Sequence, residues 1–282
     1  MSFTYEDIIN RKVSGTYSYD ERAAILYALG IGFGSTPLHH DDLSFVYEKH
    51  LRTVPTMAGL FSVPSNLLAG VDFRMVVHAG QWLTLHQELP PKGNLFIESR
   101  VVEALDKGKE IGAIIFVETK TTLKDSGSPL STAVSSIIAR GDGGFGAPDQ
   151  RPPYTHHALP SRDADRCLEI KTRPDQSIIY RLSGDLNPLH CDPEFAKMVG
   201  FTNPIMHGMC TYGICCRAII EHLCLFDPAK IRQFDGRFSA PAYPGETLIL
   251  DLWIDHEIIS YRCRLKERDV TIIDNGKCVL ST

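Results

Sequence analysis

The residues of this 282-residue chain that are best suited to acid–base chemistry lie in one segment, Y-R-L-S-G-D-L-N-P-L-H-C-D-P, which runs from Tyr180 to Pro193. It holds a carboxylate, Asp185, and an imidazole, His190, with Asn187 between them. A carboxylate and an imidazole on one short segment can act as acid and base on either side of a small substrate. The same residues could also be ordinary loop groups that satisfy local hydrogen bonds.

The sequence around this pair predicts how it is held. Pro188 disfavours helical geometry at the residue before it, so Asp185–His190 should leave the preceding helix as an irregular segment. Asp192 fits an N-cap followed by proline at the first helical position, and Gly200 fits the stop of that short helix. The pair is therefore expected on an overhang between two helices.

A second candidate feature is the start of an apolar stretch that runs from Met206 to Leu223. The stretch is apolar almost all round, which predicts a helix buried within a sheet. His207 and Gly208 open it, and unpaired backbone N–H groups there could polarise a carbonyl group. Glycine would let a ligand approach the backbone closely. The alternative is a plain helix start without a ligand.

The chain also shows an internal repeat. A-I-L-Y-A-L at 24–29 resembles S-I-I-Y-R-L at 177–182, and P-K-G-N-L-F-I at 91–97 resembles P-G-E-T-L-I at 244–249, at nearly the same offset. A Gly- and Pro-rich stretch separates the two halves. We therefore predict a duplicated domain, with halves at 1–145 and 166–282 and a linker at 146–165.

Each half is expected to run from helix through an irregular middle to closing strands, which indicates an α+β fold. At the repeat offset Asp185 falls on Gly32, and Gly208 falls on Pro55, which has no N–H. The helix of the first half should be interrupted near Pro64. The second half is therefore the one equipped for chemistry, and the first should provide an apolar channel between Leu60 and Ala69.

Composition excludes several other classes. Hydrophobic residues make up 43% and charged residues 22%, as in ordinary globular proteins. The net charge of -5 favours neither nucleic acid nor an anionic membrane, and no apolar stretch is long enough to insert into a membrane. The eight cysteines form no C-x-x-C pair, and the pairs His39-His40 and His156-His157 fit solvated surface, so no metal site is expected.

Together with other motifs, the segment Tyr180–His190 resembles the hydratase 2 motif of the MaoC-like, (R)-specific 2-enoyl-CoA hydratases. The further motifs are P-I-M-H-G-M-C-T-Y-G at 204–213, R-F-x-x-P-x-Y-P-G at 237–245, R-G-D-G-G-F-G at 140–146, L-D-K-G at 105–108, Y-A-L-G at 27–30 and F-V-Y-E at 45–48. Within the family these motifs resemble in particular those of the hydratase domain of peroxisomal multifunctional enzyme type 2.

The resemblance implies a double hot-dog fold, in which each of two tandem repeats is an antiparallel sheet around a helix and the N-terminal helix is interrupted to admit an acyl chain. It implies that Asp185 and His190 are the catalytic pair, with Asn187 between them, and that the Gly208 N–H is the oxyanion donor. The remaining implied site residues contact the acyl-CoA, except Glu48, which supports the site: His78, Ala79, Lys107, Leu186, Pro188, Leu189 and Phe238. One departure is H-A-G-Q at 78–81, where relatives commonly have H-G-E-Q.

The activity implied is reversible addition of water to trans-2-enoyl-CoA, giving (3R)-3-hydroxyacyl-CoA in fatty-acid β-oxidation, without a metal or a cofactor; coenzyme A is part of the substrate. The alternatives are a hot-dog acyl-CoA thioesterase and a non-catalytic acyl-CoA binding domain. A homodimer is expected. The resemblance suggests a peroxisomal protein, although Val279–Thr282 is not an S-K-L-type signal, and otherwise a cytoplasmic one, because the first residues do not form a secretory signal.

Overall fold

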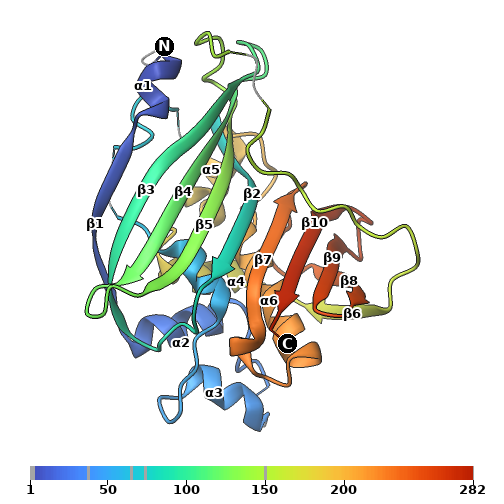
Figure 1. Cartoon of the computed structure of the whole chain (residues 1–282). Helices are drawn as coiled ribbons and strands as arrows, with labels where there is room; N and C mark the ends of the chain where they lie inside the picture. The colour runs from blue at the N-terminus through green and yellow to red at the C-terminus, as the bar shows by residue number, and fades with distance from the viewer. Residues whose placement is uncertain (1–3, 37–38, 64–65, 73–74, 149–150, 282) are drawn as a thin grey trace.

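Ten strands form one continuous antiparallel sheet in the computed structural model, which describes residues 4–36, 39–63, 66–72, 75–148 and 151–281 (Figure 1). Their order is β1-β3-β4-β5-β2-β7-β10-β9-β8-β6, so the strands of the first half occupy one side of the β2–β7 seam and those of the second half the other. The strands are β1 (Lys12–Tyr19), β2 (Val76–Leu85), β3 (Gly93–Asp106), β4 (Ala113–Leu123), β5 (Pro129–Ala139), β6 (Arg166–Lys171), β7 (Ile231–Phe238), β8 (Thr247–Asp255), β9 (Ile258–Leu265) and β10 (Thr271–Leu280). The sheet thus repeats one five-strand pattern on each side of the seam.

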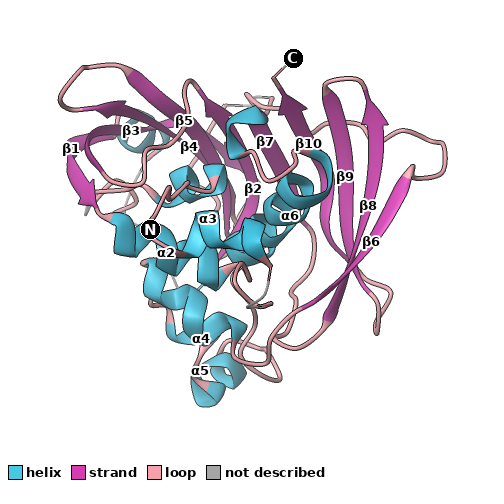
Figure 2. Ribbon diagram, turned by 90° about the horizontal axis from the view of Figure 1, so that it is seen from below, coloured by secondary structure: helices cyan, strands magenta, loops and turns pink. Residues whose placement is uncertain are grey.

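The helices α2, α4, α5 and α6 gather on one face of this sheet (Figure 2). The α-helices are α1 (Tyr5–Ile9), α2 (Glu21–Gly30), α3 (Leu43–Val46), α4 (Gln176–Tyr180), α5 (Pro193–Met198) and α6 (Gly208–Leu223). Short 3-10 turns are η1 (His40–Asp42), η2 (Pro55–Leu60), η4 (Arg181–Ser183), η5 (Pro188–His190) and η6 (Pro228–Lys230). This arrangement confirms the expected double hot-dog.

The buried helix of the second half is α6, as predicted. The helix has 16 residues, and almost all of those between Cys210 and Ile220 are buried. Cys210, Cys215 and Cys216 are buried free thiols that fill space as small hydrophobic groups.

Among the described residues, the first half has the six-residue turn η2 where the second has α6. The described residues between Phe61 and Asp72 contain no helix, and Pro64 lies outside the described residues. The prediction of an interrupted helix is therefore confirmed for the described part. Ala69, which was expected near a channel, is exposed in a surface turn.

The order of elements within each half differs from the expectation. Each half has a strand before its first long helix or strand run, β1 after the short helix α1 in the first half and β6 in the second, and a further strand in its middle, β2 or β7. The two middle strands do not alternate in the usual way: β2 contains a register shift between His78 and Gly80, and β7 carries Asp235 in a buried position.

The linker lies along the sheet. The ring of His156 stacks on Trp82 of β2 with centroids 4.9 Å apart, and Nε2 of His157 lies 2.7 Å from the Ser260 hydroxyl. His156 is exposed and His157 is half-buried, so the pair lies at the surface as expected, although both rings also contact strands.

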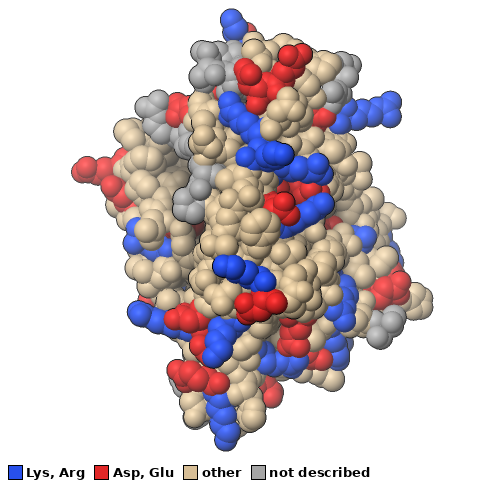
Figure 3. Space-filling view, turned by 60° about the vertical axis from the view of Figure 1, so that its left-hand side comes forward, with Lys and Arg blue, Asp and Glu red and all other residues tan. Residues whose placement is uncertain are grey.

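No helix in the described part of the chain is long and apolar enough to cross a membrane. On the face shown in Figure 3, Lys and Arg side chains are interspersed with Asp and Glu. That face therefore offers no extended basic surface of the kind that binds nucleic acid.

Candidate active site

The overhang that carries the candidate pair is built by local capping. Asp192 caps α5, accepting the N–H groups of Glu194 and Phe195, as predicted. Asp185–His190 is not wholly irregular, because Pro188–His190 forms the 3-10 turn η5. The side-chain oxygen of Asn187 accepts the Leu189 N–H at 3.0 Å and so caps this turn.

The two candidate catalytic side chains face each other across a short gap. Oδ2 of Asp185 lies 4.0 Å from Nε2 of His190, and Oδ1 of Asp185 accepts the Asn187 N–H at 3.1 Å. Nδ1 of His190 lies 2.8 Å from the carbonyl oxygen of Ile205. Because a carbonyl oxygen can only accept, Nδ1 carries the proton and Nε2 presents its lone pair toward Asp185. Burial lowers the pKa of His190, which favours this neutral form.

Gly208 begins α6 beside this pair, so its N–H has no acceptor within the helix. The Phe238 ring covers it: a β-carbon at position 208 would lie 3.1 Å from the nearest ring carbon. The His78 ring packs on the same Phe238, with centroids 4.7 Å apart, and burial lowers the pKa of His78 to about 4. One wall of the site therefore combines β2, β7 and α6, and so both halves of the chain.

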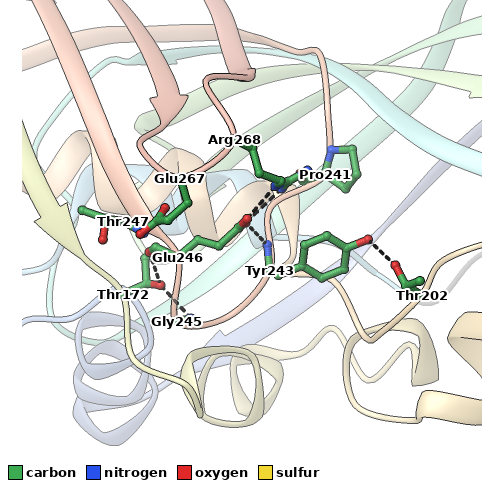
Figure 4. Close-up of polar contacts among 9 residues, drawn as sticks. All are labelled: Thr172, Thr202, Pro241, Tyr243, Gly245, Glu246, Thr247, Glu267 and Arg268. Carbon is green, nitrogen blue, oxygen red and sulfur yellow. Dashed lines mark hydrogen bonds and ion pairs between the residues drawn. The ribbon is translucent and has the colours of Figure 1, made fainter.

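The backbone that holds His190 is itself anchored, and the polar contacts of the neighbouring turn with Tyr243, Glu246 and Arg268 are drawn in Figure 4. Met206, next to Ile205, donates its N–H to Ala242 at 2.7 Å, and the Thr202 and Tyr243 hydroxyls lie 3.2 Å apart. Arg268 forms a bidentate pair with Glu246, and its guanidinium lies over the Tyr243 ring at 5.1 Å. This network fixes the segment that enters α6, and it accounts for much of the motif at 237–245.

The other implied substrate residues are more scattered. Leu186 and Pro188 are exposed on the overhang and Leu189 is half-buried. Ala79 sits at the register shift of β2, beside His78.

Lys107 is exposed in the turn after β3, two residues after the buried Leu105 of the motif L-D-K-G. Glu48 is exposed after α3, and within the described residues no hydrogen bond or ion pair joins it to Asp185 or His190. The structure therefore brings His78, Phe238 and Gly208 together with the pair, but not Lys107 or Glu48.

The departure at 78–81 has a structural explanation. A β-carbon at Gly80 would lie 3.0 Å from both the His156 ring and the Ser136 hydroxyl. Position 80 therefore faces the linker side of the sheet. His78 and Gln81 lie on either side of the register shift, and their side chains interact.

Sequence reasoning did not select one residue that the structure places in the site, His207. Its ring is buried and stacks on His190, with centroids 3.6 Å apart. Its Nε2 lies 3.2 Å from the backbone oxygen of Asp185. The only signal in the sequence was its place before Gly208.

A pocket of about 320 Å³ adjoins His190 on the overhang. Its walls come from α4, from the segment of His190 and Cys191, from Asn203 and Pro204, and from the turn of Tyr243 and Pro244. Asp185 and Gly208 do not line it, so it lies beside the reacting groups.

Asp185, His190 and His207 offer three potential metal-ligand atoms within 4.8 Å of one another. Each imidazole, however, already directs one ring nitrogen to a backbone carbonyl, and the rings stack instead of converging on one point. Tetrahedral zinc needs lone pairs that converge. The arrangement fits a water shared by Asp185 and His190 better than a metal ion.

The fold is that of the double hot-dog class, and its candidate site places a carboxylate and an imidazole near a backbone amide donor. The profile of the MFE-2 hydratase 2 N-terminal domain matches residues 17–141, and that of the MaoC like domain matches residues 156–275. The chain is 36% identical to peroxisomal enoyl-CoA hydratase 2 of Arabidopsis thaliana, covering 91% of this chain and 89% of that protein. It is 33% identical to peroxisomal multifunctional enzyme type 2 of Mus musculus over 92% of this chain and 36% of that protein. The MaoC-like dehydratase of Phytophthora capsici superposes with a TM-score of 0.86 at 29% identity, covering 99% of this chain and 98% of that one. The chain belongs to the MaoC-like hydratase 2 family.

Proposed function

We propose that this protein is an (R)-specific enoyl-CoA hydratase, which adds water reversibly to trans-2-enoyl-CoA to give (3R)-3-hydroxyacyl-CoA in fatty-acid β-oxidation. The observation that carries the proposal is the Asp185–His190 pair beside the free N–H of Gly208 at the start of α6. Membership of the hydratase 2 family supports the same reaction.

The chemistry follows from the tautomer of His190. A water between Asp185 and His190 donates one O–H to the carboxylate and the other to Nε2. As its oxygen bonds to C3 of the alkene, Nε2 accepts a proton and charge moves to the thioester oxygen. The Gly208 N–H stabilises that enolate-like charge, and the pair returns one proton to C2. Water and the enoyl-CoA combine without transfer of electrons, and Asp185, His190 and the Gly208 N–H supply the acid–base groups and the anion donor, so we propose that the reaction uses neither metal nor cofactor.

We also propose a division of labour between the halves 1–145 and 166–282, joined by the linker 146–165. The second half supplies Asp185, His190 and Gly208. Where the second half has α6, the first has the short turn η2, and this difference would leave room for the acyl chain; Gly59 of η2 packs closely against Met209 of α6. Lys107 would attract the CoA phosphates, and Leu186, Leu189 and Ala79 would contact the substrate as the family resemblance implies.

Hydration is tested by following enoyl absorbance and free thiol with crotonyl-CoA and with a longer enoyl-CoA. Loss of absorbance without release of thiol supports hydration. Release of thiol would select a thioesterase, and no change in either signal would select a binding domain.

Two finer points belong to this proposal. The Arabidopsis relative is named as a peroxisomal enzyme, which supports a peroxisomal location here.

The exposed side chains of Ile178 and Leu182 on the α4–η4 segment support a homodimer. If Leu182→Glu leaves the molar mass measured by light scattering unchanged from the wild-type value, this segment is not the dimer contact.

A further inference from the structure

His207 makes two contacts with the catalytic pair at once, and both come from one buried side chain. Its Nε2 approaches the backbone oxygen of Asp185 at 3.2 Å, and its ring lies against His190 with an interplanar angle of 27°. Tyr180 packs on the other side, with ring centroids 4.9 Å apart. The His207 imidazole thus packs against both Tyr180, which begins the motif, and His190, the proposed base.

The protonation of His207 follows from these contacts. Because the Asp185 carbonyl can only accept, Nε2 of His207 must carry the proton. Nδ1 is buried and has no hydrogen-bond partner among the described residues. A second proton there would place a buried N–H without a hydrogen-bond partner beside the second imidazole of His190, and burial lowers the pKa of His207 to about 4. His207 is therefore neutral, with a fixed donor.

We propose that His207 is a positioning residue that sets the Asp185–His190 distance, by holding the Asp185 backbone through Nε2–H and the His190 ring through stacking. The inference rests on the proposed hydratase function. The inference goes beyond that function because the proposed mechanism assigns His207 no contact with the water or the thioester. The next residue is Gly208, so the same side chain also fixes the start of α6 relative to the pair.

Three substitutions separate the two contacts. His207→Phe keeps a ring for stacking but removes the donor. His207→Gln places an amide donor where Nε2 was, whereas the shorter amide of His207→Asn cannot reach that far. His222→Phe, at an exposed position of the same helix, is the matched control.

With crotonyl-CoA, we expect His207→Phe to lower kcat on the order of 10- to 100-fold, since a displacement of about 1 Å can cost that much. KM should change by less than about 3-fold, because His207 does not contact substrate. His207→Gln should recover most of kcat, and His207→Asn should remain about 10-fold below it. His222→Phe should match the wild type.

A His207→Phe variant that folds and keeps kcat within about 2-fold of wild type would overturn the proposal. So would His207→Gln performing no better than His207→Asn, a comparison that stands even if the Phe variant does not fold. Nitrogen-15 imidazole spectra of the wild type give an independent test, since they must show the Nε2–H tautomer at His207. If the wild type does not hydrate crotonyl-CoA, the proposed function fails, whereas the spectra still test the tautomer.

Discussion

Oδ2 of Asp185 and Nε2 of His190 are separated by 4.0 Å, which is too long for a direct hydrogen bond and suits a single water bonded to both. Since we propose that both groups act on one water, Asp185→Ala and His190→Ala should each lower kcat by at least about 100-fold. The double variant should lose much less than the product of the two losses, because either change disables the same step. Steady-state hydration of crotonyl-CoA measures this, with circular dichroism to establish folding. Near wild-type turnover in either folded single variant would disprove the assignment.

The close packing of Gly208 against Phe238 predicts a second effect. In Gly208→Ala the new methyl group would press on the Phe238 ring, and overpacking of this kind costs about 1–3 kcal/mol. We expect lower kcat, because the amide donor and the ring move apart. Adding Phe238→Leu should restore part of the loss by making room. If the double variant is no better than Gly208→Ala alone, the effect does not come from this contact.

Chain-length selection should depend on Gly59. A β-carbon there would lie 2.7 Å from the end of the flexible Met209 side chain, so Gly59→Val would displace Met209 into the space proposed for the acyl chain. Each buried methylene of an acyl chain contributes roughly 0.8 kcal/mol. We therefore expect lower kcat/KM for long enoyl-CoA substrates and little change for crotonyl-CoA.

Ala69→Trp provides the control for this experiment, because Ala69 is exposed in a surface turn and a bulky residue there should not alter chain-length preference. Equal losses on short and long substrates in Gly59→Val would contradict an acyl site in the first half.

Asp235, buried at the seam between β2 and β7, predicts a dependence of stability on pH. Burial raises the pKa of its carboxyl from 3.8 to about 6, although the Leu83 N–H and the Gln233 amide donate to it. Because the folded protein favours the neutral form, this group's contribution is fully present below pH 3.8 and is lost as the pH rises through about 6.

Asp235→Asn should therefore raise the free energy of unfolding near pH 7.5 by up to about 3 kcal/mol, and by much less near pH 4. Urea denaturation at the two pH values measures the difference. An equal change at both would show that the ionised carboxylate is not the destabilising group.

The features that the sequence predicted well are those with local causes. The cap at Asp192 and the buried helix from Gly208 depend on neighbouring residues, and the structure contains both. Strand β2 was missed because its register shift at Ala79 breaks the period-two pattern, and a shift of this kind depends on the partner strand. His207 was overlooked for a similar reason: its contacts to Asp185 and His190 exist only after the overhang folds onto α6. Glu48 shows the opposite case, since a motif suggested a supporting role and the described structure leaves the residue exposed.

The seam between β2 and β7 has an evolutionary consequence. Two identical subunits that paired their sheets in this way would have to accept every substitution twice, once in each copy. Covalent fusion ends that symmetry, since a residue such as Pro55 can change without altering Gly208 at the equivalent position. A fused pair of repeats then has one proposed reacting centre instead of two. The first repeat can vary to accept substrates of different shapes, while the geometry of the proposed site in the second repeat stays constant.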